Sequence, residues 1–128
     1  MRWWFDEQAL VPHVAMRLPN ADQATIASDK LRDYLLSPEH PVGRFKAAFF
    51  AGLGYTRDDW AVLESDLRSQ HLRLDADEVG RSKYGRKFTI TGDLRGPSGS
   101  WATVVSVWII LRGEDRPRFV TAYPGGTP

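Results

Sequence analysis

Cysteine is absent from the 128 residues of this chain, and histidine occurs only three times. Without cysteine there is no disulfide, iron–sulfur cluster, thiolate zinc site or cysteine nucleophile. The three histidines, His13, His40 and His71, lack the spacing that is typical of a metal site. We therefore expect no metal and no cofactor, so any chemistry has to rely on imidazole, ammonium and hydroxyl groups.

Long apolar segments are also missing. The longest apolar run, Trp101–Leu111, has 11 residues and includes a threonine and a serine. A helix needs about 20 apolar residues to span a bilayer. The N-terminal stretch lacks the continuous apolar core of a secretory signal. We therefore expect a cytoplasmic protein that does not associate with membranes.

Net charge is nearly absent, with 17 basic side chains against 16 acidic ones. The resulting charge of +1 provides no overall attraction to nucleic acid. Residues 1–78 nevertheless carry 9 basic and 13 acidic side chains, whereas residues 79–128 carry 8 and 3. Either the second segment presents a basic surface, or the opposite charges hold the two halves together.

The length is that of one domain, and no repeat or linker divides it. We expect a single α+β domain over residues 17–128, preceded by an N-terminal extension over residues 1–16 whose status the sequence leaves open. Trp3, Trp4 and Phe5 in this extension are costly to expose to water. They are expected to pack on the domain or on a second copy of the chain.

Three helices are expected before three longer strands. Caps, prolines and apolar spacing predict helices at 29–36, 41–53 and 56–70, and strands at 24–26, 87–94, 101–111 and 119–123. The second helix is apolar nearly all round, Phe45 included, and is expected in the core. The predicted fold class is α+β, with the N-terminal helices packed on one face of a three- to four-stranded antiparallel meander.

The densest group of reactive side chains is His40, Arg44 and Lys46. His40 lies in a turn before a helix, where backbone N–H groups favour an anion such as phosphate. Lys46 is one of only two charges on an apolar helix, so its ammonium needs a partner or a cleft. The pair is a candidate for acid–base work and phosphate clamping. The structural alternative is a capping histidine in a turn and a lysine that reaches for solvent or pairs with a carboxylate such as Asp33 or Glu39.

Two further groups lie in the predicted sheet. Lys83, Tyr84 and Arg86 combine positive charge with an aromatic ring, as phosphate-binding and base-stacking surfaces do. Thr121 and Tyr123 share one face of the last strand and place two hydroxyls near its end. A solvated sheet face and simple β-propensity explain the same residues without a function.

Several blocks of this sequence resemble a bacterial and archaeal domain family of unknown function. They include Arg17-Leu-Pro-Asn-Ala-Asp22, the whole of residues 29–46 and the segment 118–124, and the resemblance covers about residues 17–124. Similar domains occur at the C-terminal ends of large polymorphic toxins. The order of helices followed by an antiparallel meander is also similar to the barnase–EndoU–colicin–RelE superfamily of metal-independent ribonucleases.

This resemblance implies an endoribonuclease of bacterial toxin type that acts on tRNA or mRNA without metal or cofactor. His40, Lys46, Thr121 and Tyr123 are then the catalytic candidates, and Lys83, Tyr84, Arg86 and Arg44 are the substrate-binding candidates. RNA and a small cognate antitoxin or immunity-like protein are the expected partners. The alternative is a non-catalytic interaction module: one half of a toxin–antitoxin-like pair, or a homodimer formed through Trp3, Trp4 and Phe5.

Overall fold

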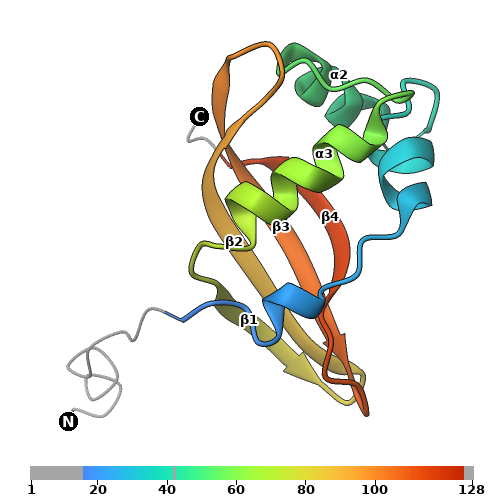
Figure 1. Ribbon diagram of the computed structural model, residues 1–128. Coiled ribbons are helices and arrows are strands. Elements are labelled where there is room, and N and C mark those ends of the chain that lie inside the picture. The colour runs from blue at the N-terminus through green and yellow to red at the C-terminus, as the bar shows by residue number, and fades with distance from the viewer. Residues whose placement is uncertain (1–15, 42, 126–128) are drawn as a thin grey trace, which may run out of the picture.

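A computed structural model describes residues 16–41 and 43–125. Five helical segments precede or flank a sheet of four strands in this part of the chain (Figure 1). The helical segments are η1 (Ala21–Gln23), η2 (Lys30–Leu35), α2 (Arg44–Gly52), α3 (Trp60–Asp66) and η3 (Leu67–His71). The strands are β1 (Asp77–Ser82), β2 (Gly85–Arg95), β3 (Trp101–Leu111) and β4 (Arg118–Pro124). The predicted α+β class is therefore confirmed.

The four strands form an antiparallel sheet in the order β1-β2-β3-β4, so the predicted meander is confirmed. The two longest strands pair in register from Gly85↔Leu111 to Arg95↔Trp101. β3 lies between β2 and β4, which agrees with its apolar side chains on both faces. The pairing of β3 with β4 shifts between Val107 and Trp108, so one residue of β4 bulges there.

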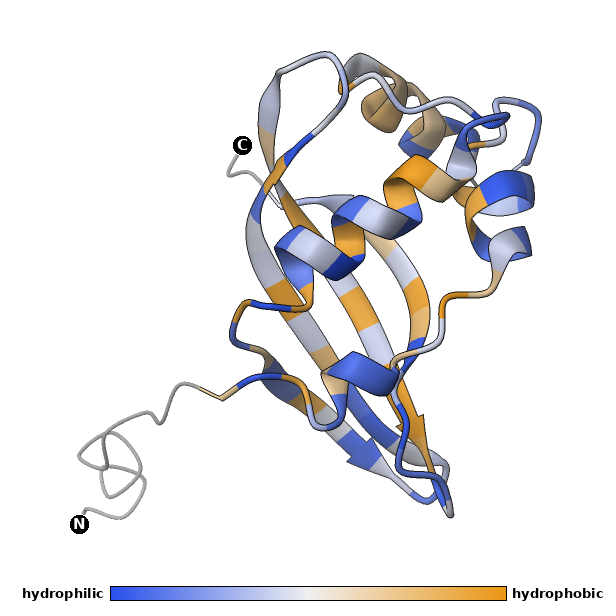
Figure 2. Ribbon diagram, viewed as in Figure 1, coloured by the Kyte–Doolittle hydropathy of each residue, from blue (hydrophilic) through white to orange (hydrophobic). Residues whose placement is uncertain are grey.

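The core contains buried side chains from both the sheet and the helical segments. Helix α3 crosses in front of the sheet in the view of Figure 1, and hydrophobic positions alternate with polar ones along β2 (Figure 2). The largest fully buried side chain is that of Trp108, whose ring meets Phe119 edge-on at 5.3 Å between centroids. Leu31, Phe50 and Leu63 bring η2, α2 and α3 into the same buried cluster. Burial of these apolar side chains is the main source of stability for the fold.

The structure corrects two expected elements. The strand predicted at 24–26 is an isolated parallel bridge: Thr25 N–H donates to the Pro117 carbonyl at 2.9 Å, and Phe119 N–H donates to the Thr25 carbonyl at 2.9 Å. The prediction that α2 lies wholly in the core is wrong, because only Ala47 and Phe50 of this helix are buried. The Phe45 side chain is 71% exposed.

Two predictions concern the N-terminal residues that lie outside the described part of the chain. Trp3, Trp4 and Phe5 lie outside the described residues, so their packing stays a prediction, as does the domain boundary after residue 16.

In the described part, no helix is long and apolar enough to cross a membrane. The same residues contain no group of three or more histidine or carboxylate side chains placed to hold a metal ion.

Candidate functional site

Lys46 joins three elements through its ammonium group. Its Nζ donates one hydrogen bond to Tyr34 Oη at 3.1 Å and another to Thr121 Oγ1 at 3.1 Å. Tyr34 lies on η2, Lys46 on α2 and Thr121 on β4, so residues far apart in the sequence meet at one point. The ammonium also lies 5.3 Å from the centre of the Tyr34 ring, within the range of a cation–π contact.

His40 lies beside this cluster, in the turn that leads into α2. Its Nδ1 accepts a hydrogen bond from the Gly43 N–H at 3.0 Å. Its ring meets that of Tyr34 edge-on, with 4.9 Å between centroids and 82° between planes. Gly43 allows this approach, because a side chain there would collide with the Tyr34 carbonyl. Tyr34 therefore contacts both His40 and Lys46.

The arrangement determines what each group offers a ligand. With Nδ1 accepting from Gly43, a neutral His40 ring carries its proton on Nε2. An ammonium has three N–H donors, and Lys46 uses two of them on Tyr34 and Thr121. The third donor and the positive charge are suited to an anionic oxygen. The cluster therefore combines a fixed positive charge, an imidazole and two hydroxyls, which are groups that can bind a phosphate and exchange protons with its ligands.

The structural alternative is met in one part and not in another: His40 does cap the turn through Gly43 N–H, whereas no ion pair of Lys46 with Asp33 or Glu39 occurs among the described residues. Among the described residues, the printed partners of its ammonium are two hydroxyls, whereas Asp33 binds Arg32 at 3.1 Å and Arg57 at 3.2 Å. Hydrogen bonds from Arg32 and Arg57 hold the pKa of the Asp33 carboxyl below its usual value. Lys46 is thus a half-buried cation held by neutral oxygens, which leaves its charge available to an anion.

The remaining predicted site residues lie apart from this cluster or at its border. Tyr123 is two residues beyond Thr121 on β4, on the same side of the strand, and is 37% exposed. Arg44 begins α2 and its guanidinium lies 4.7 Å from the centre of the exposed Phe45 ring. Lys83, Tyr84 and Arg86 lie at the β1–β2 hairpin, at the end of the sheet opposite α2 (Figure 1).

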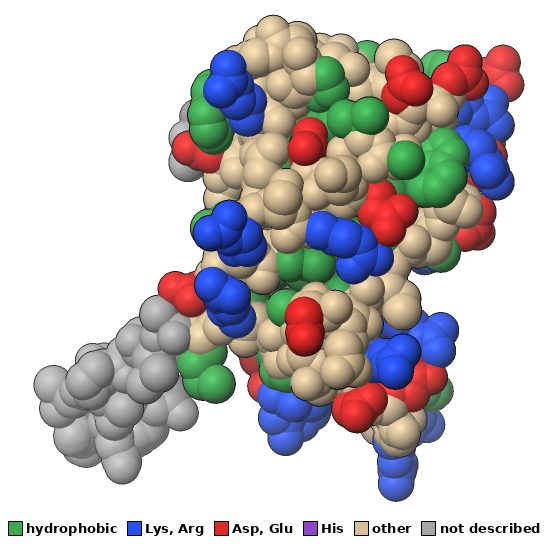
Figure 3. Space-filling view, viewed as in Figure 1, with side chains coloured by type: hydrophobic (Ala, Val, Ile, Leu, Met, Phe, Trp, Pro, Cys, Tyr) green, Lys and Arg blue, Asp and Glu red, His purple; other side chains and the backbone are tan. Residues whose placement is uncertain are grey.

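Basic side chains gather where the β1–β2 hairpin meets the β3–β4 turn (Figure 3). There Glu78 accepts hydrogen bonds from two guanidinium groups, those of Arg81 at 2.9 and 3.2 Å and of Arg86 at 3.3 and 3.0 Å. The bonds from Arg86 and Arg81 lower the pKa of Glu78 to about 2. We call this group of Glu78, Arg81 and Arg86 the Glu78 clamp. The pairing register of β1 with β2 shifts next to it, between Glu78 and Gly80.

A buried histidine forms a further polar cluster inside the core. His71 and Ser106 are both fully buried, and His71 Nδ1 lies 2.8 Å from Ser106 Oγ. His71 Nε2 lies 3.1 Å from the Gly92 carbonyl, and Trp108 Nε1–H donates to Ser106 Oγ at 2.9 Å. The carbonyl can only accept, so Nε2 carries the proton and Ser106 donates to Nδ1. Every polar atom of this chain of bonds is satisfied, which makes the cluster structural.

Protonation of His71 is expected to destabilise the fold, because burial lowers its pKa below the ordinary value of 6.5. As pH falls below about 6.5, the unfolded chain takes up a proton that the folded chain refuses, so the free energy of unfolding falls. We expect Tm to drop between about pH 7 and about pH 5, more steeply in the wild type than in His71→Asn. Thermal unfolding followed by circular dichroism measures this, and equal slopes would contradict it.

Comparison with known proteins places these clusters in a family. A family model described as a domain of unknown function, DUF6883, matches residues 17–126. The chain belongs to this family. No curated protein and no solved structure matches it. The region matched to DUF6883 contains Lys46 with its neighbours Tyr34, His40 and Thr121, which we call the Lys46 cluster. It also contains the β1–β2 hairpin with its basic side chains.

In this DUF6883 domain, the sequence did not point to Tyr34 beside Lys46 or to Glu78 at the β1–β2 hairpin, nor to the buried cluster of His71 and Ser106. Tyr34 has the spacing of a core residue. Its hydroxyl could have drawn attention to it, because a tyrosine hydroxyl that is taken from water needs a hydrogen-bond partner. Glu78 lies in a stretch of acidic residues that is typical of a solvated loop. Its contact with the Arg86 guanidinium depends on the pairing of β1 with β2, which nothing in the local pattern predicts.

Proposed function

We propose that this protein is a metal-independent endoribonuclease of bacterial toxin type, acting on tRNA or mRNA. The observation that carries the proposal is the ammonium of Lys46, held between Tyr34 Oη and Thr121 Oγ1 at 3.1 Å from each and close to the His40 ring. A preorganised cation of this kind stabilises the charge that develops on a phosphate in the transition state.

In the proposed reaction, the 2′-oxygen of a ribose forms a bond to the adjacent phosphorus and the bond from phosphorus to the 5′-oxygen breaks. His40 Nε2 takes the proton of the 2′-hydroxyl, and Tyr123 gives its hydroxyl proton to the departing 5′-oxygen. The proton returns from His40 to Tyr123 through solvent. Lys46 neutralises the extra negative charge, and Thr121 positions Lys46.

This role of His40 requires a change in the ring. Nε2 accepts a proton only when the ring proton lies on Nδ1, whereas Nδ1 accepts from Gly43 N–H in the structure. The Gly43 contact therefore has to open when RNA binds. Catalytic hydrogen bonds commonly reach their working geometry only in the complex with substrate.

The arrangement of helices in the proposal follows the expectation from the sequence. Leu31, Phe50 and Leu63 share the buried cluster that also contains Val104 and Trp108 of β3. This supports helices packed on the Val104–Trp108 face of the sheet. In the proposal, Thr121 and Tyr123 lie on the face of β4 that they share with Val105 and Val107, at the sheet edge that Lys46 of α2 reaches, and RNA approaches them there.

Growth arrest on expression in a bacterial host tests the function in cells. We expect wild-type protein to arrest growth and His40→Ala to relieve the arrest. His40→Asn is the matched control for folding, since its amide oxygen can still accept from the Gly43 N–H. Relief by both variants with unchanged expression supports catalysis by the ring, and arrest that persists in both would contradict it.

Phe45 is expected to stack on a base of the RNA, because an exposed aromatic ring beside the Arg44 guanidinium lies one residue from Lys46. Stacking of a base on an aromatic side chain contributes about 1–3 kcal/mol. Phe45→Ala is therefore expected to lower kcat/KM for RNA by about tenfold or more, while Phe45→Trp retains it. Tm is expected to stay unchanged in both. Steady-state cleavage of a labelled oligonucleotide measures the effect, and an unaltered kcat/KM in Phe45→Ala would disprove the stacking.

The antitoxin-like partner and the homodimer stay predictions that a separate experiment addresses. Deletion of residues 1–16, followed by light scattering, compares the oligomeric state with and without Trp3, Trp4 and Phe5. A dimer that dissociates on deletion favours the interaction module. A monomer that keeps all its properties after deletion counts against it.

A further inference from the structure

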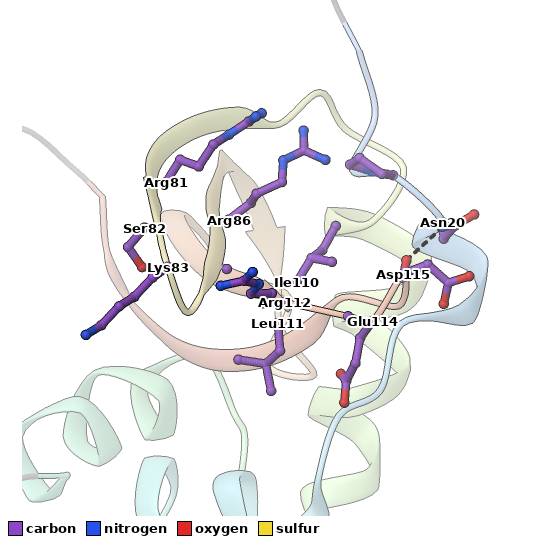
Figure 4. A pocket seen from close by; sticks show the side chains of 13 residues that line it. Asn20, Arg81, Ser82, Lys83, Arg86, Ile110, Leu111, Arg112, Glu114 and Asp115 are labelled. Atoms are coloured by element: carbon purple, nitrogen blue, oxygen red, sulfur yellow. Dashed lines mark hydrogen bonds between the residues drawn. The ribbon is translucent and has the colours of Figure 1, made fainter.

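We propose that the cleft between the β1–β2 hairpin and the β3–β4 turn binds the phosphate groups of a ligand about the size of a nucleotide. The cleft has a volume of about 460 Å³, within the range of small-ligand sites. Figure 4 shows Arg81, Arg86 and Arg112 around it, with Glu114 and Asp115 on the far wall. The site is distinct from the Lys46 cluster, and binding there does not depend on cleavage of RNA.

The lining of the cleft suits a ligand that is partly apolar and partly anionic. Ile110 and Leu111 of β3 supply apolar surface at the base of the cleft. Four cationic side chains line it, against two carboxylates: Arg81, Lys83, Arg86 and Arg112, with Glu114 and Asp115. Apolar surface beside converging guanidinium groups is the combination that a ring and a phosphate require.

The clamp on Glu78 shows how this end of the molecule holds an anion. Two guanidinium groups, from Arg81 and Arg86, each give two hydrogen bonds to the same carboxylate. Paired N–H donors in a fixed fork match the oxygens of a phosphate as well as those of a carboxylate. Two positive charges share one negative charge, so the clamp keeps a net positive charge. Glu78 therefore occupies donors that a phosphate can use.

Further positive charge in the cleft exceeds the negative charge of Asp115, the one lining carboxylate for which no ion pair is found among the described residues. Among the described residues, no ion pair joins Arg112 or Lys83 to an acidic side chain, and the Lys83 ammonium lies 5.2 Å from the centre of the Tyr84 ring. Glu114 is already neutralised, because Arg118 binds both of its oxygens at 3.0 and 2.7 Å. The cleft as a whole therefore attracts anions.

Two hydrogen bonds to backbone carbonyls hold the walls of the cleft in place before any ligand arrives. Asn20 Nδ2 donates to the Asp115 carbonyl at 2.7 Å and ties the N-terminal segment to the β3–β4 turn. Arg112 N–H donates to the Tyr84 carbonyl at 2.8 Å and ties that turn to the β1–β2 hairpin. A preformed site loses less conformational freedom on binding, which favours affinity.

Equilibrium binding in EDTA tests the proposal, with adenosine diphosphate and a short 2′-O-methyl oligonucleotide as probes. Neither probe can be cleaved by 2′-hydroxyl attack, so the failure of binding and the failure of the proposed ribonuclease are separate results. Arg112→Ala is expected to weaken binding about tenfold, as loss of a charged hydrogen bond does. Glu78→Gln is expected to strengthen binding severalfold because it releases two guanidinium groups. Lys30→Ala removes an exposed charge on η2 and is expected to change nothing.

The relative affinities of the two probes identify the ligand, and the variants show whether it binds in the cleft. Tighter binding of adenosine diphosphate identifies a free nucleotide as the ligand, and tighter binding of the oligonucleotide identifies a segment of RNA. Absence of binding by both probes would overturn the proposal. So would equal affinities of Arg112→Ala and Lys30→Ala. A Glu78→Gln variant that folds with the wild-type Tm and binds no better than wild type would contradict the role of Glu78.

Discussion

Replacement of Lys46 by methionine is expected to lower kcat for RNA cleavage by about a hundredfold or more. Methionine keeps an unbranched stem of similar length, so packing between Tyr34 and Thr121 is retained while the charge is lost. We expect the Tm of Lys46→Met to equal or exceed that of the wild type, because a half-buried ammonium is removed. Single-turnover cleavage of a labelled RNA measures the effect on the chemical step.

Two companion variants separate charge from position. Lys46→Arg keeps the charge but changes the donor geometry, so partial activity is expected. Thr121→Val removes one of the two oxygens that hold Nζ and is expected to lower kcat by a smaller factor than Lys46→Met, with little change in KM. Wild-type cleavage by Lys46→Met would remove Lys46 from the mechanism and leave it a structural residue.

Replacement of His71 by alanine is expected to be the most destabilising of these substitutions. It leaves a cavity in the core and takes hydrogen-bond partners from Ser106 Oγ and the Gly92 carbonyl. Each buried polar group left unsatisfied costs about 1–3 kcal/mol. We expect a total loss of about 3 kcal/mol or more in the free energy of unfolding. Urea denaturation measures this loss.

The Ser106→Ala variant completes a double-mutant cycle with His71→Ala. Because His71, Ser106 and Trp108 share one chain of hydrogen bonds, the two losses are expected to be non-additive. The double variant should be more stable than the sum of the two single losses predicts. Additive losses, or a loss below about 1 kcal/mol for His71→Ala, would contradict the network.

The long strands were predictable because their signals are local. Alternation of apolar residues along β2 and a run apolar on both faces in β3 determine their positions, and glycine turns separate them. β1 has no such signal, since all six of its residues are exposed and it is held by pairing with β2. Its position follows from the sheet edge rather than from its own composition.

The composition of α2 led to a wrong prediction of its burial. An apolar helix predicts burial all round, yet Phe45 and Ala48 are exposed because this helix packs on the core through Ala47 and Phe50. Hydrophobicity alone does not determine which faces find a partner. The same exposure makes Phe45 a candidate for stacking on RNA.

The candidate site was partly predictable. An isolated cation on an apolar helix has to find a partner, which directs attention to Lys46 without any structure. Its contact with Thr121 on β4 joins residues 75 positions apart, and the hydroxyls of β4 marked that strand as a candidate. Tyr34 and the Glu78 clamp depend on how elements pack and pair, and therefore required the three-dimensional arrangement.

Cleavage of RNA in EDTA tests the central claim most directly. Purified wild-type protein is incubated with total bacterial RNA, and the fragment ends are sequenced and chemically mapped, with Lys46→Met as the control. We predict discrete cuts in tRNA or mRNA that leave 2′,3′-cyclic phosphate and 5′-hydroxyl ends, and no cuts with Lys46→Met. Intact RNA after incubation with folded wild-type protein, or equal cutting by Lys46→Met, would contradict the account.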